Sequence, residues 1–463
     1  MADAPVSAGE GRFELETELA RDLGLLSATT IIIGGIIGSG IFGAPAGIAK
    51  QLGSPGLIML VWVIGGILSF CGAVCFAELG GMIPRTGGQF IYLRQAYPPI
   101  IAFLYGWTEV YMISAASVAA IAVVFTSYLG YFLPAISPDN PLLTIGGFVL
   151  STQHAVILAC VIFLGAVNYF GVRFGGFVQN LFTIAKVTAL GGLVLVVAAA
   201  GGEWGHFRPL LPESPQPGLM EAFGAAMIGT MFAYNGWASA NMVTGEIKDP
   251  QRQLPRAIFV GLFVCIAVYL AVNWSFIYVM AVEEIAASPR IAADVAERVV
   301  GPIGGSLISF AVMISTFGTI NANMLSPPRI IYAMAKEGLF FRWLNYVHPV
   351  YRTPSRSIVA LTVWASLWTF LGSFQAIVDA FAYSLYTFYS LSVISLFLVR
   401  RKYPIAVRPV KAWGYPVTPI IFLAISAWYV STVLIFKTRE SLPGLAFLAV
   451  GVVVYVVWFR KTR

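Results

Sequence analysis

The sequence predicts an all-α integral membrane protein with twelve transmembrane helices, and three observations support this fold class. Of the 463 residues, 58% are hydrophobic and only 11% are charged, with a mean hydropathy of +0.82. Apolar stretches of about 20 residues, the length needed to cross a bilayer, recur along the whole chain. Most of the 28 lysines and arginines lie between these stretches. The bilayer is therefore the expected solvent for most of the protein.

The twelve expected spans leave no room for a separate soluble domain. They lie near 24–50, 56–77, 101–132, 153–170, 175–199, 219–243, 257–281, 304–332, 357–371, 374–399, 416–436 and 442–459. Placing the N-terminus in the cytoplasm assigns most lysines and arginines to cytoplasmic loops, which is the orientation that membrane proteins favour. We therefore expect both termini in the cytoplasm.

Two of the expected spans are interrupted. Residues 36–42 (IIGSGIF) place two glycines around a serine in the middle of the first span. Because lipid cannot replace backbone hydrogen bonds, such an interruption is stable only where the opened backbone lines a cavity in the protein. A second interruption, FAYNGW at 232–237, lies in the sixth span. Paired broken helices predict the binding site of a transporter.

The chemistry of a broken helix predicts the kind of ligand. Carbonyl groups at the end of one half-helix can bind an ammonium group, and N–H groups at the start of the next can bind a carboxylate. An α-amino acid carries both groups. Neither break contains an acidic residue, which favours neutral over cationic substrates. The predicted substrate-binding residues are Ile37, Gly38, Ser39, Gly40, Phe232, Ala233, Tyr234, Asn235 and Gly236.

Several polar residues are predicted inside the membrane. Lys186 lies near the centre of the fifth span, where a lysine costs roughly 2.5–3.5 kcal/mol on insertion scales. It either bonds backbone carbonyls to hold helices together or acts as a coupling amine that carries a proton. For Glu109 and Asp379, structural pairing near an interface and a proton-linked role are equally consistent with the sequence. The hydroxyl-rich run 315–321 either forms hydrogen bonds between helices or is part of the ligand site. Trp237 follows the second break directly, so we assign it to the site.

The motifs together carry a family resemblance. Residues 37–42 resemble the first-helix motif of the amino acid–polyamine–organocation (APC) superfamily. FAYNGW, with TGEIKDP at 244–250 and LPRAI at 254–258, resembles the L-amino-acid transporter branch, and residues 328–354 are similar to the exit of its eighth helix. The resemblance implies a LeuT-type fold, with five helices repeated in inverted topology, discontinuous helices 1 and 6, and two further helices. The implied divisions are a tail at 1–23, a first repeat at 24–199, a second repeat at 219–399, two helices within 412–459, and a tail at 460–463.

The resemblance also implies roles for individual residues. Lys186 matches a lysine whose amine takes roughly the place of a sodium ion and ties the first helix to the eighth, with Ser315 and Thr316 as candidate partners. Phe232 matches an aromatic gate over the substrate, and Trp237 is a second gate candidate. Animal members that are tethered to a glycoprotein heavy chain have a cysteine between helices three and four. Because 133–152 contains none, we expect a stand-alone, bacterial protein without a disulfide-linked heavy chain.

The predicted function is secondary transport of L-amino acids across the plasma membrane by alternating access, as exchange of neutral amino acids. The alternative is a proton-coupled symporter, or a cationic amino acid or polyamine transporter, of the same fold. An enzyme would need a polar catalytic cluster and a channel would need repeated polar rings, and the sequence has neither pattern. The cysteines lie in apolar runs and the histidines lack ligand spacing, so we expect no metal and no cofactor.

Overall fold

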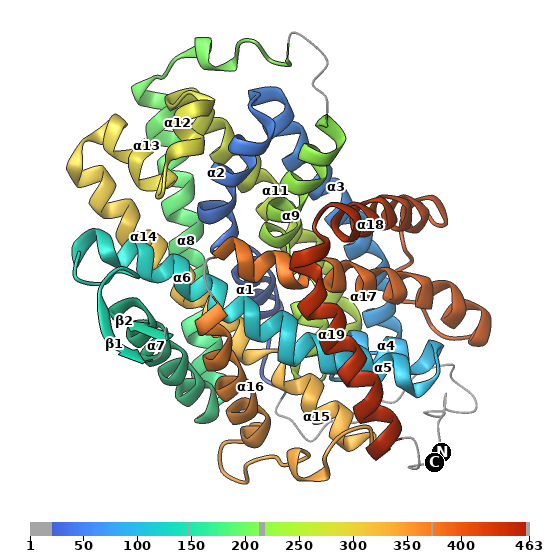
Figure 1. Ribbon diagram of the computed structural model, residues 1–463. Helices are drawn as coiled ribbons and strands as arrows, with labels where there is room; N and C mark the ends of the chain where they lie inside the picture. Colours follow the sequence, from blue (N-terminus) through green and yellow to red (C-terminus); the bar gives the residue numbers. More distant parts are fainter. Residues whose placement is uncertain (1–20, 146–147, 213–217, 372–373, 460–463) are drawn as a thin grey trace.

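Helices pack side by side and make up most of the described part of the molecule (Figure 1). The computed structural model describes residues 21–145, 148–212, 218–371 and 374–459. The α-helices are α1 (Leu25–Ile36), α2 (Gly40–Leu52), α3 (Pro55–Met82), α4 (Gln89–Ala96), α5 (Pro99–Thr108), α6 (Ala115–Phe132), α7 (Thr152–Tyr169), α8 (Val172–Ala200), α9 (Leu219–Ala233), α10 (Ser239–Met242), α11 (Pro250–Val279), α12 (Val282–Ala287), α13 (Ile291–Val300), α14 (Pro302–Leu325), α15 (Pro328–Lys336), α16 (Ser355–Trp368), α17 (Phe374–Lys402), α18 (Val417–Phe436) and α19 (Thr438–Val454). Short 3₁₀ or π turns are η1 (Glu109–Ser114), η2 (Trp204–Phe207), η3 (Thr244–Glu246), η4 (Arg342–Leu344), η5 (Thr369–Leu371) and η6 (Tyr455–Phe459). We call the end of the molecule that carries α12 and α13 the upper end, and the end that carries α15 the lower end.

Within the described residues, 10 helical segments are long and apolar enough to cross a membrane. They coincide with ten of the twelve expected spans. The expected sixth span is divided, because α9 has 15 residues and stops at Ala233. The expected ninth span is α16, which has 14 residues. The number and apolar character of these helices confirm the prediction of a helical, multi-pass membrane protein.

One segment departs from the all-α prediction. Strands β1 (Pro141–Ile145) and β2 (Phe148–Ser151) pair antiparallel, with Leu143 opposite Leu150. The Ser151 side chain then accepts a hydrogen bond from the His154 N–H and caps the start of α7. Strands of four or five residues leave too few alternating positions to be recognised in sequence. The sequence prediction therefore treated this segment as a plain connection.

Both predicted interruptions are real breaks in helices. Helix α1 ends at Ile36 and α2 begins at Gly40, so residues 37–39 join two separate helices. Helix α9 ends at Ala233, and α10 begins five residues further on at Ser239. Helix α2 packs against α9, and α1 packs against α8, α11 and α14. Both breaks consequently lie in the interior of the bundle.

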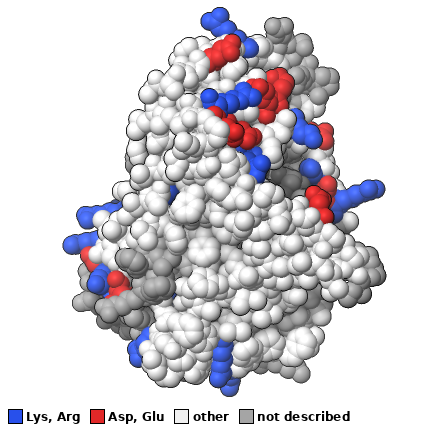
Figure 2. Space-filling view, turned by 90° about the vertical axis from the view of Figure 1, so that its left-hand side faces the viewer, with Lys and Arg blue, Asp and Glu red and all other residues white. Residues whose placement is uncertain are grey.

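Charged residues concentrate away from the middle of the molecule. Figure 2 shows a face whose central part carries neither acidic nor basic residues, whereas charged side chains gather toward its margins. At the lower end, Arg329 pairs with Glu246 at 2.9 Å, and both side chains are buried. At the upper end, Arg298 pairs with Glu284 at 2.6 Å in a partly exposed position. The two hydrogen bonds from Arg298 lower the pKa of Glu284 to about 2. This distribution is that of a protein with a lipid-facing belt between two polar ends.

Candidate functional site

The two helix breaks touch each other directly. Gly236 has a φ of +124°, and a Cβ there would lie 2.6 Å from the carbonyl carbon of Gly35. A Cβ on Gly40 would lie 2.4 Å from the Cα of Ala233. Only glycine allows backbones to approach so closely, and only glycine adopts a φ of this sign without strain. The interruptions in α1–α2 and α9–α10 therefore form one contiguous structure.

The glycines of the first break also pack against neighbouring helices. The sequence predicts Gly38 and Gly40 as substrate-binding residues. In the structure, a Cβ on Gly38 would lie 2.5 Å from the side chain of Thr319, and Gly40 lies against Ala233. These glycines are needed for contact between helices, which a sequence without spatial neighbours cannot distinguish from contact with a ligand.

Lys186 reaches the first break from α8. Its Nζ donates hydrogen bonds to the carbonyl oxygens of Ile37 (2.6 Å) and Gly34 (3.3 Å) and to the hydroxyl of Thr319 (2.8 Å). An ammonium group has three N–H donors, so all three are used. The cation lies at the end of α1, where unpaired carbonyls and the negative end of the helix dipole favour a positive charge. Lys186 thus ties α1 to α8 and α14.

The expected partners of Lys186 in α14 were wrong. Thr316 bonds back to the carbonyl oxygens of Val312 and Met313 in its own helix. The buried hydroxyl of Ser315 has no hydrogen-bond partner within the described structure. Thr319 lies one helical turn beyond Ser315, at the level of the first break, and is the residue that Lys186 contacts. Spacing along one helix gave the correct face but not the depth at which α8 meets it.

Tyr269 joins the two breaks and was missed from sequence. Its hydroxyl lies 2.6 Å from the carbonyl oxygen of Ile36 and 2.9 Å from that of Ala233, the last residues of α1 and α9. The single hydroxyl hydrogen is shared between these two acceptors. Tyrosine in an apolar span carries no local signal of this role. Only the three-dimensional position of α11 between the breaks reveals it.

The start of α2 provides donors that no backbone group uses. Within the described chain, the N–H groups of Ser39, Gly40 and Ile41 have no backbone acceptor. The Ser39 hydroxyl is buried, at 1% exposure, and also lacks a partner there. A helix N-terminus carries a partial positive charge and binds anions. This end of the break is arranged to receive a carboxylate.

A small, partly open cavity lies at this helix start. Its walls come from α1, α2, α6, α9, α14 and the two breaks. The lining residues are Gly35, Ile36, Gly38, Ser39, Gly40, Ser117, Ile121, Phe232, Asn235, Thr319 and Asn323. Five of the predicted substrate-binding residues therefore line one cavity, together with Thr319 of the run 315–321 and five residues that were not predicted to bind substrate. None of the lining residues is acidic or basic.

The residues of the second break divide between the cavity and the surrounding core. Phe232 lines the cavity and packs edge-on against Phe381 of α17, with ring centroids 6.2 Å apart. Asn235 also lines it, and its Oδ1 accepts a hydrogen bond of 2.8 Å from the hydroxyl of Tyr389. Tyr234 instead packs against Tyr269. The second break thus contributes one aromatic side chain and one amide to the cavity.

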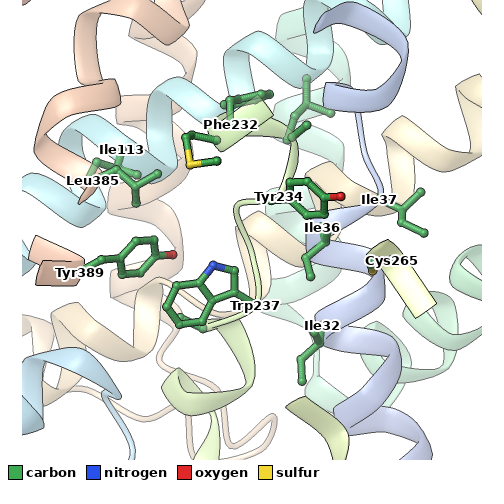
Figure 3. Packing of buried hydrophobic residues seen from close by; sticks show 14 of the residues in the cluster. Ile32, Ile36, Ile37, Ile113, Phe232, Tyr234, Trp237, Cys265, Leu385 and Tyr389 are labelled. Atoms are coloured by element: carbon green, nitrogen blue, oxygen red, sulfur yellow. The ribbon is translucent and has the colours of Figure 1, made fainter. Parts of the chain in front are cut away.

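Trp237 does not line the cavity. Its buried ring packs against Phe76 of α3, at 4.8 Å, and Tyr389 of α17, at 4.5 Å. Figure 3 shows Phe232 and Trp237 at opposite ends of the interrupted segment, with Trp237 beside Tyr389. The two predicted gate residues thus occupy different levels of the bundle.

Of the two predicted acidic residues, Glu109 lies outside the cavity lining. Glu109 is buried on the π-helical turn η1, and its Oε1 accepts a hydrogen bond of 2.9 Å from Ser114. Asp379 belongs to α17, but its side chain lies outside the described residues. Among the residues that the structure describes, no three histidine, cysteine, aspartate or glutamate side chains gather as metal ligands would, and the four cysteines are buried and unpaired.

Comparisons with known proteins agree with this geometry. A family model described as amino acid permease matches residues 23–458. The serine/threonine exchanger SteT of Bacillus subtilis is 31% identical over 93% of this chain and 96% of its own. The human b(0,+)-type amino acid transporter 1 is 31% identical over 96% of this chain and 88% of its own. The large neutral amino acids transporter small subunit 2 of Mus musculus is 31% identical over 100% of this chain and 85% of its own.

Proposed function

This chain belongs to the amino acid permease family of the APC superfamily, and from that premise we propose that it exchanges neutral L-amino acids across the plasma membrane by alternating access. The observation that carries the proposal is the contact between two broken helices beside a cavity with unused donors. The relatives of this chain are named as amino acid transporters and exchangers, not as enzymes. Transport, and no chemical conversion of the substrate, is the proposed activity.

The substrate's head group would bind across the two breaks. Its α-carboxylate would accept hydrogen bonds from the N–H groups at the start of α2 and from the Ser39 hydroxyl. Lys186 and Thr319 already occupy the carbonyls of Gly34 and Ile37. The α-ammonium is then left with carbonyl lone pairs at the end of α9 and with the oxygen of Asn235. Because the lining lacks an acidic side chain, the proposal favours neutral over cationic amino acids and polyamines.

Lys186 would serve as a built-in cation of the transport cycle. In sodium-coupled relatives a metal ion would sit near the carbonyls that Lys186 binds, so the lysine removes the need for that ion. Because Lys186 is part of the chain, it cannot cross the membrane with the substrate as a sodium ion does, although a lysine that released its proton would support the symport alternative. This arrangement supports exchange, in which one amino acid moves out as another moves in.

Two aromatic side chains are proposed as gates. Phe232 lines the cavity, where a change in its position would open or cover the substrate. Trp237 packs between α3 and α17 at the other end of the second break. Alternating access requires that the two positions open in turn, because a pathway open at both would be a channel.

The finer architecture is also a proposal. It comprises twelve helices, with an inverted repeat of 24–199 and 219–399, two further helices within 412–459, and the tails 1–23 and 460–463 in the cytoplasm. Counting α9 with α10, and α16, as the sixth and ninth spans completes the twelve. The equivalent positions of the two breaks, in the first helix of each proposed repeat, support this division.

We propose that the transporter acts without a disulfide-linked heavy chain. One mouse relative is named a small subunit, which indicates a partner for that protein. The segment 133–152 of this chain, between α6 and α7, contains no cysteine for such a tether. Separation of the purified protein on denaturing gels with and without reductant would show any covalent partner.

Glu109 motivates one alternative mechanism. Its buried carboxyl group accepts a hydrogen bond from the hydroxyl of Ser114 and could take up a proton during transport. The relevant test uses liposomes that contain the purified protein. If the protein is an exchanger, labelled alanine should enter vesicles loaded with unlabelled alanine at least about tenfold faster than it enters empty vesicles. Uptake into empty vesicles that follows an imposed pH gradient, and stops with a protonophore, would instead support proton symport.

A further inference from the structure

The far wall of the cavity suggests how a substrate side chain is selected. Helix α6 contributes Ser117 and Ile121 to the lining, and α14 contributes Thr319 and Asn323. These residues line the same cavity as the start of α2, where the proposed function places the substrate's α-carboxylate. The substrate side chain must therefore occupy the space between this helix start and the α6–α14 wall.

Most polar groups of that wall are already paired. The hydroxyl of Thr319 binds Lys186 and backbone carbonyls. The oxygen of Asn235 accepts from Tyr389, and the amide nitrogen of Asn323 donates to the carbonyl oxygen of Thr319. The hydroxyl of Thr319 therefore has no hydrogen left for a ligand, whereas the oxygen of Asn235 keeps a second lone pair for the substrate's ammonium group.

The hydroxyl of Ser117 is different. It is buried, at 3% exposure, and has no hydrogen-bond partner within the described structure. Serine and threonine side chains in a helix commonly bond back to a carbonyl one turn earlier. Thr126 in the same helix does so, with its hydroxyl 3.1 Å from the carbonyl oxygen of Ala122. An unpaired buried hydroxyl is energetically unfavourable, so a ligand that pairs it gains affinity.

The local backbone of α6 adds a second observation. Ser117 lies in the first turn of α6, directly after the π-helical turn η1. Single π turns are rare and occur frequently at functional sites. The irregular turn and the unpaired hydroxyl thus occur together where α6 borders the cavity.

We propose that Ser117 is a specificity-determining residue that selects amino acids with a short, hydroxyl-bearing side chain, the β-hydroxy amino acids. The proposal rests on the proposed function, because it takes the head group to be bound at the start of α2. Ser117 then pairs with the side-chain hydroxyl of the substrate. Ile121 and Phe232 bound the space beside it and restrict the length of the side chain.

Threonine and valine provide a direct test, because they have nearly the same shape and differ by a hydroxyl in place of a methyl group. A site that hydrogen-bonds a substrate hydroxyl strongly rejects the analogue that lacks it. In vesicles loaded with alanine, we expect the wild-type protein to exchange threonine with a kcat/KM about 10- to 100-fold above that for valine. The Ser117→Ala variant should bring this ratio to within about twofold of one.

Ser309→Ala is the matched control, because Ser309 is another buried, unpartnered hydroxyl, placed on α14 outside the cavity lining. It should keep the wild-type ratio. Equal rates for threonine and valine in the wild type, or an unchanged ratio in Ser117→Ala, would overturn the role of Ser117 while alanine exchange still supports the proposed function. If the wild type exchanges no amino acid, including alanine, the proposed function itself fails.

Discussion

Replacing Lys186 by methionine tests the built-in cation most sharply. Methionine has a similar length but no donor, so the bonds to Gly34, Ile37 and Thr319 are lost. The Thr319 hydroxyl has one hydrogen and lies 3.0 Å from both carbonyl oxygens, so it can satisfy one of them. At least one carbonyl at the end of α1 then stays buried and unpaired.

The expected change in the free energy of unfolding of Lys186→Met follows from three effects. Hydrogen bonds to a charged group contribute about 1.5–3 kcal/mol each, but removing a buried charge also relieves a desolvation penalty of several kcal/mol. If these two effects largely cancel, the unpaired carbonyl remains, at about 1–3 kcal/mol. We therefore expect Lys186→Met to lower the free energy of unfolding by about 1–3 kcal/mol. If α1 must be held in place for transport, the same energy lowers the exchange rate by about 5- to 150-fold.

The assay combines thermal unfolding in detergent with alanine exchange in liposomes. Lys50→Met is the control, because Lys50 is an exposed lysine of α2, and it should change stability by no more than about 0.5 kcal/mol. Combining Lys186→Met with Thr319→Val should cost less than the sum of the single changes, since the two side chains contact each other. Wild-type exchange in Lys186→Met, or strict additivity in the double variant, would refute the reasoning.

Three further substitutions probe the framework of the site. Tyr269→Phe should lower stability by about 1–3 kcal/mol and slow alanine exchange, because the last carbonyls of both broken helices lose their shared donor; an unchanged exchange rate would remove Tyr269 from the site. Gly236→Ala should destabilise the protein more than Gly301→Ala, since both have positive φ but only Gly236 faces a backbone contact; equal unfolding midpoints would contradict this. Arg329→Met should lower the free energy of unfolding by about 3–5 kcal/mol, because its buried carboxylate partner is left unpaired. Arg298→Met breaks a partly exposed pair and should lower it by less than about 1 kcal/mol. Chemical denaturation of both variants would test this order.

The sequence was sufficient to locate the breaks and the buried cation. Glycine and asparagine within apolar spans are incompatible with an uninterrupted helix in lipid, so the interruptions at 37–39 and 234–238 could be predicted closely. A lysine in the middle of a span must find acceptors, and the free carbonyls of a broken helix are the nearest chemical match. The breaks and the buried lysine follow from local chemistry, whereas the link between Lys186 and the first helix was implied by the family resemblance.

The partners across helices could not be predicted in the same way. Thr319, Tyr269 and Ser117 lie on three different helices, and their roles depend on the rotation and depth of each helix in the bundle. Periodicity gives the face of a helix but not the level at which a neighbour meets it. The same limit explains why the contact between Gly40 and Ala233 could not be predicted.

The central claim is that the paired breaks bind the head group of an amino acid. A structure of the purified protein with bound L-alanine, determined by electron cryomicroscopy, tests it most directly. The account predicts the alanine carboxylate within about 3.2 Å of backbone N–H groups of residues 39–41, in the cavity that Phe232 lines. Alanine bound elsewhere, such as in the pocket between α2 and α9 beside Lys50, with residues 39–41 free of contacts, would contradict the account.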